Sequence, residues 1–195
     1  EPSQVNCVIY HADCTDGFGA AYSAWKMLGN RAEYHACKHG TTPPDVEGKV
    51  VAILDFSFNN ATTKQMIEEA DGLIVIDHHK SAMVELHDIS NTHFDMTKSG
   101  AMLAWEFFHP GKEPPKFIRY IQDRDCGPGN LNILKSLALL LIWCLSSLKS
   151  LRSLKMIQCS TTLLREEATY LPTQRLLLRK SVRKQLSVTL KTKKL

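Results

Sequence analysis

Short apolar runs and amphipathic stretches alternate along the first 80 residues of the chain. The runs at 50–54 (VVAIL) and 73–76 (LIVI) are apolar throughout, which is typical of strands buried on both faces of a parallel sheet. Between such runs, apolar residues recur at helical spacing, as in residues 16–28. We expect strands over residues 5–11, 32–38, 50–54 and 73–76, and helices over residues 16–28, 60–70, 98–108 and 113–125.

This alternation predicts the fold class and the extent of the first domain. It is the sequence form of β-α-β units, so we expect an α/β fold over residues 1–129, with a doubly wound, mainly parallel sheet flanked by helices. Residues 130–162 lose the alternation, and we expect a divergent, poorly packed helical segment there. Residues 163–195 are expected to form a linker helix, interrupted at Pro172, and the first strand of an absent or incomplete substrate-binding domain.

Composition bears on location. The longest apolar stretch, residues 137–145, is too short to span a bilayer, so we expect no membrane segment. The chain starts at Glu1 without a basic and then apolar leader, and no secretory signal is expected. The six cysteines include no C-x-x-C pair, which favours a reducing compartment and predicts a cytoplasmic protein.

The net charge of +4 conceals a difference between the two parts of the chain. From residue 130 onward there are 13 Lys and Arg residues against two acids, whereas the first 129 residues carry a net charge of −7. The basic tail from Arg165 to Lys194 can neutralise phosphates without sequence preference, which predicts a weak contact with nucleic acid. A solvated linker helix is the alternative explanation of the same charges.

Side chains of metal-binding type stand at the ends of three predicted strands. His11 ends the first strand, Asp55 follows the third, and Asp77, His78 and His79 follow the fourth. In an open parallel sheet these ends lie at one edge, where ligands bind. Clustered acids repel one another unless a cation neutralises them, and mixed carboxylate and imidazole donors suit Mn²⁺, Mg²⁺ or Fe²⁺. The donors suffice for two ions about 3.5–4 Å apart, with Asp77 as the expected bridge, and such a pair activates water for attack on phosphorus.

Four motifs in this region resemble those of the DHH phosphoesterase superfamily in order and spacing. They are HADCTDGFGAA (11–21), ILDFS (53–57), VIDHHKSA (75–82) and TKSGAMLAWEFF (97–108). The resemblance covers residues 5–126 and is nearest to the branch with oligoribonuclease-like and exopolyphosphatase-like members. It implies a Mn²⁺-dependent hydrolase of phosphodiester or phosphoanhydride bonds, acting on a short oligonucleotide or nucleotide.

Carried over to this sequence, the motifs imply a set of site residues. The implied metal ligands are His11, Asp13, Asp16, Asp55, Asp77, His78 and Asp123. Asp77 and His79 are the implied catalytic residues, with His79 orienting the site or touching the phosphate. Lys80, Ser99, Gly100 and Arg124 are the candidate substrate-binding residues, and ordinary surface charge is the alternative explanation of Lys80 and Arg124. The N–H groups at Ser99 and Gly100 open a helix and can receive a phosphate, or Ser99 simply caps the helix.

Some assignments within the motifs have alternatives. Cys14 occupies a slot that holds an acid in many family members, and the neighbouring Asp13 is the other candidate for it. The fourth-motif acid is Asp123 or Asp125, with Asp123 favoured. The glycine- and histidine-rich motif of the family's C-terminal domain does not occur in this sequence. The alternative to a hydrolase is therefore an impaired or truncated member that binds metal or nucleic acid without turnover; the oligomeric state stays open.

Overall fold

The computed structural model describes residues 1–127 of the chain. Within them, five strands form one sheet in which all neighbouring strands are parallel. In their order across the sheet, the strands are β2 (Glu33–Cys37), β1 (Cys7–His11), β3 (Val50–Leu54), β4 (Gly72–Asp77) and β5 (Thr92–Phe94). The predicted α/β fold with a parallel sheet is confirmed for this part of the chain. The expected segments 130–162 and 163–195 lie outside the described residues.

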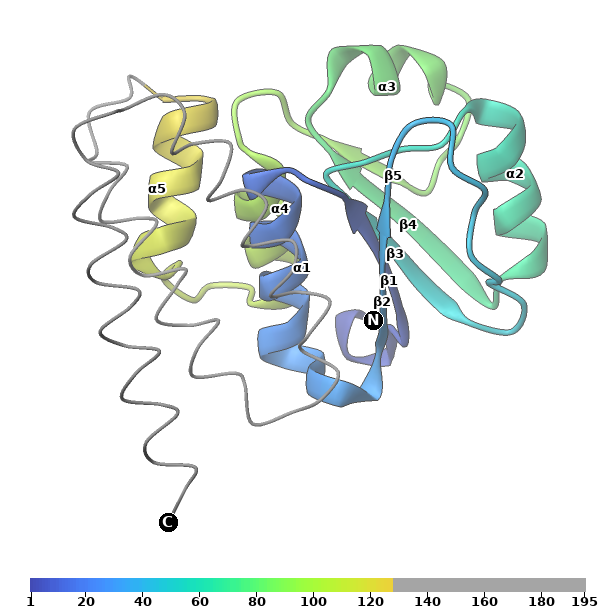
Figure 1. Cartoon of the computed structure of the whole chain (residues 1–195), viewed down its shortest axis with the longest axis horizontal. Coiled ribbons are helices and arrows are strands. Elements are labelled where there is room, and N and C mark those ends of the chain that lie inside the picture. Colours follow the sequence, from blue (N-terminus) through green and yellow to red (C-terminus); the bar gives the residue numbers. More distant parts are fainter. Residues whose placement is uncertain (128–195) are drawn as a thin grey trace, which may run out of the picture.

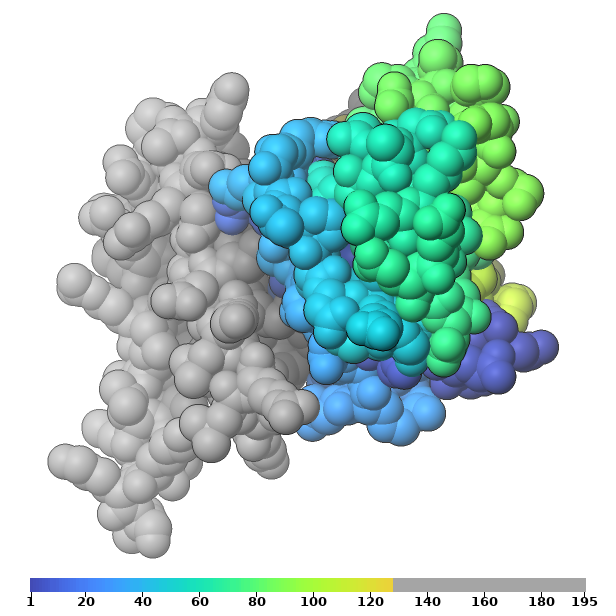
Figure 2. Space-filling model, turned by 90° about the vertical axis from the view of Figure 1, so that its right-hand side faces the viewer, coloured from blue at the N-terminus to red at the C-terminus, as the bar shows by residue number. Residues whose placement is uncertain are grey.

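Helices cover both faces of the sheet (Figure 1). On one side lie α1 (Thr15–Leu28), α4 (Gly100–Phe108) and α5 (Lys116–Asp125); on the other lie α2 (Asn60–Glu69) and α3 (Lys80–Glu85). Short 3-10 helices occur at Pro2–Gln4 and Gly29–Arg31. Figure 2 shows the α2 side, where the segment between β2 and β3 runs beside α2. The sheet is therefore doubly wound, as predicted.

Side chains of the strands alternate between two hydrophobic cores. Val8 and Leu54 pack on one face with Leu103 of α4 and the small residues of α1. Ile9 and Val51 pack on the opposite face with Met66 of α2. Because both faces are covered, a strand here needs apolar residues at every position, which explains the unbroken apolar runs in the sequence.

The strand order reverses direction between β1 and β3. The chain leaves β1 through α1 to reach β2 on one side, and it leaves β3 through α2 to reach β4 on the other. The register pairs Tyr10 with Leu54 and Leu54 with Ile76, so β1, β3 and β4 end level with one another. The carboxyl edge at such a switch point is where open α/β sheets bind ligands.

Besides the two short 3-10 helices, the observed elements α3 and β5 are missing from the prediction. β5 has only three residues, and its pairing with β4 places Phe94 opposite Asp77. α3 has six residues, fewer than two helical turns. Hydrophobic periodicity cannot identify elements this short, because they contain barely one repeat of either pattern.

Candidate metal centre

Three neighbouring strand ends bring three predicted ligands into one row. His11 ends β1, Asp55 directly follows β3, and Asp77 ends β4. Asp55 and Asp77 are each only 1% exposed, so their carboxylates line the floor of the site. Asp55 has a φ of 53°, a left-handed conformation that non-glycine residues seldom adopt and that is frequent at functional sites.

His78 lies among three carboxylates. Its Nε2 is 3.2 Å from Oδ1 of Asp55, 3.4 Å from Oδ2 of Asp16 and 3.5 Å from Oδ2 of Asp125. The interaction with Asp55 is the largest cause that raises the pKa of His78 to about 9; burial opposes it, and the charges of Asp16 and Asp125 add to it. Acids from two helices and a strand end therefore meet at a point that requires positive charge.

Asp55 is a buried carboxylate that pairs with the imidazoles of His11 and His78 but forms no hydrogen bond. Among the described residues, the buried side-chain nitrogen and oxygen atoms that lack a hydrogen-bond partner are both Asp55 oxygens and Nδ1 of His11. Nδ1 of His11 lies 3.7 Å from Oδ2 of Asp55, too far for a hydrogen bond. Burial raises the pKa of Asp55, but the imidazoles of His11 and His78 outweigh it and hold this pKa below its usual value. A buried carboxylate whose oxygens make no hydrogen bond can accept a further ligand, and a divalent cation fits the donors present.

Asp77 fixes the orientation of His79. Oδ1 of Asp77 accepts hydrogen bonds from the backbone N–H of His78 at 2.7 Å and from Nδ1 of His79 at 2.7 Å. The hydrogen bond to Asp77 is the main cause that raises the pKa of His79. Because Nδ1 is held, Nε2 is the ring nitrogen of His79 that remains for a ligand, and this side chain is 47% exposed.

Asp16 joins the site to the start of α4. Its carboxylate accepts hydrogen bonds from the N–H groups of Gly100 at 2.8 Å and Ala101 at 2.6 Å. Burial, and then the charge of Asp55, raise the pKa of Asp16. The Ser99 N–H donates to Oε1 of Gln122 at 2.7 Å. The N–H groups of Ser99 and Gly100, which are predicted from the sequence to bind a substrate phosphate, thus donate to side chains of the protein instead. The alternative role of Ser99 as a helix cap is confirmed, because its Oγ accepts a hydrogen bond from the Met102 N–H.

The first motif places Cys14, and not Asp13, beside the other ligands. Cys14 offers its sulfur within 4.8 Å of ligand atoms of His11 and Asp55. Burial, with a contribution from the charge of Asp55, raises the pKa of Cys14 to about 12. Asp13 has an exposed side chain and forms an ion pair with Lys38, and it belongs to none of the potential metal-binding groups found in residues 1–127.

The fourth motif places Asp125, at the end of α5, next to His78. Asp123, the favoured residue, is in none of the potential metal-binding groups of the described chain. Sγ of Cys126 lies 3.9 Å from Nδ1 of His78. Of the predicted substrate contacts, Lys80 is exposed at the start of α3, and Arg124 donates to Oγ1 of Thr15 at 3.3 Å.

His39 is a neighbour of the site that the sequence analysis does not single out. Its ring centroid lies 5.9 Å from that of His11 and 5.2 Å from that of Phe56. Gly40, which follows it, has a φ of 83°, and Thr41 donates to the carbonyl oxygen of Lys38, so a tight turn holds His39 at the rim. The single sequence signal for this placement is the glycine after the histidine.

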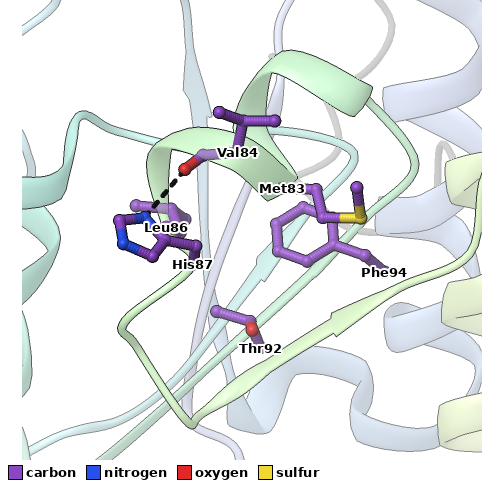
Figure 3. Close-up of a pocket in the computed structure, with 6 residues that line it drawn as sticks. All are labelled: Met83, Val84, Leu86, His87, Thr92 and Phe94. Atoms are coloured by element: carbon purple, nitrogen blue, oxygen red, sulfur yellow. Dashed lines mark hydrogen bonds between the residues drawn. The ribbon is translucent and has the colours of Figure 1, made fainter.

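An open apolar hollow lies elsewhere, between α3 and β5 (Figure 3). Its lining residues are Met83, Val84, Leu86, His87, Thr92 and Phe94. On one side of the hollow, Nδ1 of His87 donates to the carbonyl oxygen of Val84, three residues earlier, at 3.0 Å. None of these residues belongs to the groups of potential metal ligands, so this hollow is separate from the strand-end site.

Comparisons with known proteins support the fold, and they identify no activity. No family model matches the chain. It is 35% identical over 140 residues to the uncharacterized protein R106 of Acanthamoeba polyphaga mimivirus; the match covers 63% of this chain and 33% of that protein. The chain therefore spans about a third of the length of this relative.

Among solved structures, an uncharacterized protein from Helicobacter pylori G27 is similar, with a TM-score of 0.55 and 12% identity. The match covers 73% of this chain and 49% of that one. At this identity the likeness extends to the fold alone. Within residues 1–127, no helix has the length and apolar character needed to cross a membrane.

Proposed function

We propose that the strand-end site binds two divalent cations, Mn²⁺ foremost, and hydrolyses phosphodiester or phosphoanhydride bonds, as the resemblance to DHH phosphoesterases implies. One observation carries the proposal: both oxygens of the buried Asp55 carboxylate lack a hydrogen bond, and the imidazole nitrogens of His78 and His11 that pair with them lie 3.2 and 3.7 Å away. Buried carboxylate oxygens in proteins rarely lack a hydrogen bond or a metal ion. The neighbouring carboxylates and imidazoles supply the further donors that a hard cation needs.

The ligand set comes from the residues that surround Asp55 and His78. It comprises His11, Asp16, Asp55, Asp77, His78 and Asp125. We replace Asp123 of the sequence prediction by Asp125, because Oδ2 of Asp125 lies 3.5 Å from Nε2 of His78. When bound, two divalent cations supply a water of lowered pKa and a clamp for the phosphate oxygens.

The chain's own residues position and stabilise the reacting phosphate. Asp77 holds His79 through Nδ1, so Nε2 is free to donate a hydrogen bond to a phosphate oxygen as negative charge develops there. The hydrogen bond to Asp77 raises the pKa of His79, which favours the doubly protonated ring that this donation requires. The N–H groups of Gly100 and Ala101 hold the Asp16 carboxylate in place. Its Oδ2, which lies near His78, therefore does not have to move when a cation binds.

Short oligonucleotides and nucleotides are the substrate class that we propose. Lys80 and Arg124 are the basic residues on the α3 and α5 sides of the centre, and each can meet a phosphate that flanks the reacting one. A contact through the basic tail from Arg165 to Lys194 lies outside the described residues. We also propose a reducing compartment such as the cytoplasm, since the four cysteines among residues 1–127 are all free.

Hydrolysis by the full chain tests the proposal. With Mn²⁺ present, we expect cleavage of bis-p-nitrophenyl phosphate or of a short RNA. Asp55→Asn should lower kcat by at least about 100-fold, the scale of losing a group that acts electrostatically in the transition state. Asp71→Asn is the matched control, because Asp71 is an exposed acid between α2 and β4 and should leave the rate unchanged. Equal rates for the wild type and Asp55→Asn would contradict the mechanism.

A second proposal, metal binding without turnover, is favoured by one observation. A thiol, that of Cys14, stands beside His11 and Asp55, where many members of the resembled family have an acid. Calorimetry separates the two proposals: Mn²⁺ binding to a chain that hydrolyses neither phosphate ester supports this second one.

A further inference from the structure

Cys14 lies between the last residue of β1 and the first turn of α1, on the floor of the site. It is the residue before α1 begins, and its backbone is extended. Its sulfur, a ring nitrogen of His11 and a carboxylate oxygen of Asp55 all lie within 4.8 Å of one another. Three ligand atoms so placed can contact one ion.

An independent observation indicates that this group receives a ligand. Nδ1 of His11 and both oxygens of Asp55 are buried and have no hydrogen-bond partner, and Asp55 is 1% exposed. These are the polar atoms that an ion beside Cys14 would satisfy. The thiol of Cys14 therefore lies beside the buried atoms of His11 and Asp55 that lack a hydrogen bond.

Neighbouring candidates for the same role have other surroundings. Asp13 has a φ of 55° and an exposed carboxylate that is paired with Lys38. Cys126 is exposed, and it lies in a different group, with His78 and Asp125. The atoms of that group are not among the buried atoms without partners. Cys14 is thus the side chain of the first motif that completes the position.

We propose that His11, Cys14 and Asp55 form one cation position of the centre, and that its thiolate raises the affinity of this position for Zn²⁺ and Co²⁺ relative to that for Mg²⁺ and Mn²⁺. Imidazole, thiolate and carboxylate together are a donor set for borderline-soft ions, whereas oxygen-rich sets suit the hard ones. On binding, the S–H bond breaks, the proton passes to solvent and a sulfur–metal bond forms, with no change of oxidation state. This inference rests on the metal centre of the proposed function.

Absorption spectra of the full chain titrated with Co²⁺ test it without any substrate. A bound Co²⁺ shows ligand-field bands in the visible region, and a thiolate ligand adds a sulfur-to-cobalt charge-transfer band in the near ultraviolet. We expect both in the wild type. Cys14→Ser should lose the charge-transfer band, and the control Cys126→Ser should keep it.

Cys14→Asp is the second variant, because it restores the acid found in many members of the resembled family. It should bind Co²⁺ with ligand-field bands alone. Its Zn²⁺ affinity should fall relative to its Mn²⁺ affinity by at least about tenfold, since even groups that only orient a ligand are worth about 10–100-fold. An unchanged ratio of the two affinities would overturn the inference.

A measurement on the wild type alone guards against misfolded variants. Zn²⁺ should slow the alkylation of Cys14 by iodoacetamide several-fold, as followed by peptide mass, and equal rates with and without Zn²⁺ would overturn the inference. If Co²⁺ binds without a charge-transfer band, the thiolate ligand is refuted and the proposed metal centre survives. If Co²⁺ does not bind at all, both are refuted.

Discussion

Gly100, the first residue of α4, lies directly against the side chain of Asp55. A Cβ atom at position 100 would lie 2.7 Å from Cγ of Asp55 and 2.5 Å from its Oδ1. Gly17 has a similar role at the start of α1, where a Cβ would lie 2.8 Å from Cβ of His11. These two glycines allow the starts of α1 and α4 to approach the strand ends closely, and the site depends on that approach.

We predict that Gly100→Ala disrupts the centre. The added methyl group must displace Asp55 or α4, and overpacking of this kind costs about 1–3 kcal/mol of the free energy of unfolding. Urea denaturation measures this loss, and calorimetry with Mn²⁺ measures the accompanying loss of affinity. The control is Gly72→Ala, because a Cβ at residue 72 would meet only Val50, at 4.0 Å. Equal stability and equal Mn²⁺ affinity of the two variants would contradict the packing argument.

Mn²⁺ should stabilise the wild type against unfolding. A ligand that binds only the folded state at about 100 times its Kd adds about 2.7 kcal/mol. Thermal unfolding with Mn²⁺, and then with excess EDTA, measures the shift and its reversal. In Asp55→Asn the shift should vanish, whereas Asp71→Asn should retain it. A shift that persists in Asp55→Asn would mean that the ion binds elsewhere.

His79→Gln should lower kcat with little change in Mn²⁺ affinity. The reason is that His79 is oriented by Asp77 and is proposed to contact the phosphate, with no place in the ligand set. We expect a loss of about 10²–10³ in kcat, measured with bis-p-nitrophenyl phosphate, while calorimetry with Mn²⁺ gives a wild-type Kd. His35→Gln, at a partly exposed histidine paired with Glu33, is the control. Loss of Mn²⁺ binding in His79→Gln would instead make His79 a ligand.

Stability should depend on pH through His109, which is remote from the metal centre. This residue is 6% exposed, its ring stacks on Trp105 with centroids 4.0 Å apart, and Nε2 lies 2.9 Å from the carbonyl oxygen of Ser23. Burial is the main cause that lowers its pKa below 6.5, and the charges of Lys112 and Lys26 act in the same direction. The unfolded chain therefore binds the proton more readily than the folded chain.

The stability contributed by neutral His109 is present above pH 6.5 and is lost as the pH falls through the lowered pKa of the folded state. Urea denaturation of the wild type and His109→Gln, both in EDTA, measures this contribution. We expect the wild type to lose more stability than the variant between about pH 8 and about pH 5. Parallel pH profiles would contradict this assignment.

Much of the fold and part of the site follow from the sequence. His11, Asp55 and Asp77 are predictable because each ends an apolar run, and parallel strands bring such ends together. The short elements α3 and β5 are not predictable, since they carry too few residues for a period. The fold class is confirmed for residues 1–127.

Contacts made by helix ends and loops depend on tertiary packing, which no local pattern encodes. Asp125 and Asp123 are both polar positions near the end of α5, and only the packing of this helix brings Asp125 to His78. The pairing of Asp16 with the start of α4 joins residues 84 and 85 positions apart. His39 reaches the rim through a turn in the loop after β2.

Anomalous diffraction from crystals of the full chain soaked in Mn²⁺ tests the central claim most directly. We expect anomalous peaks within coordinating distance of the Asp55 carboxylate, with His78 and Asp77 among the nearest side chains. Peaks only at exposed acids such as Asp71, or Asp55 oxygens that remain without a metal at saturating Mn²⁺, would contradict it.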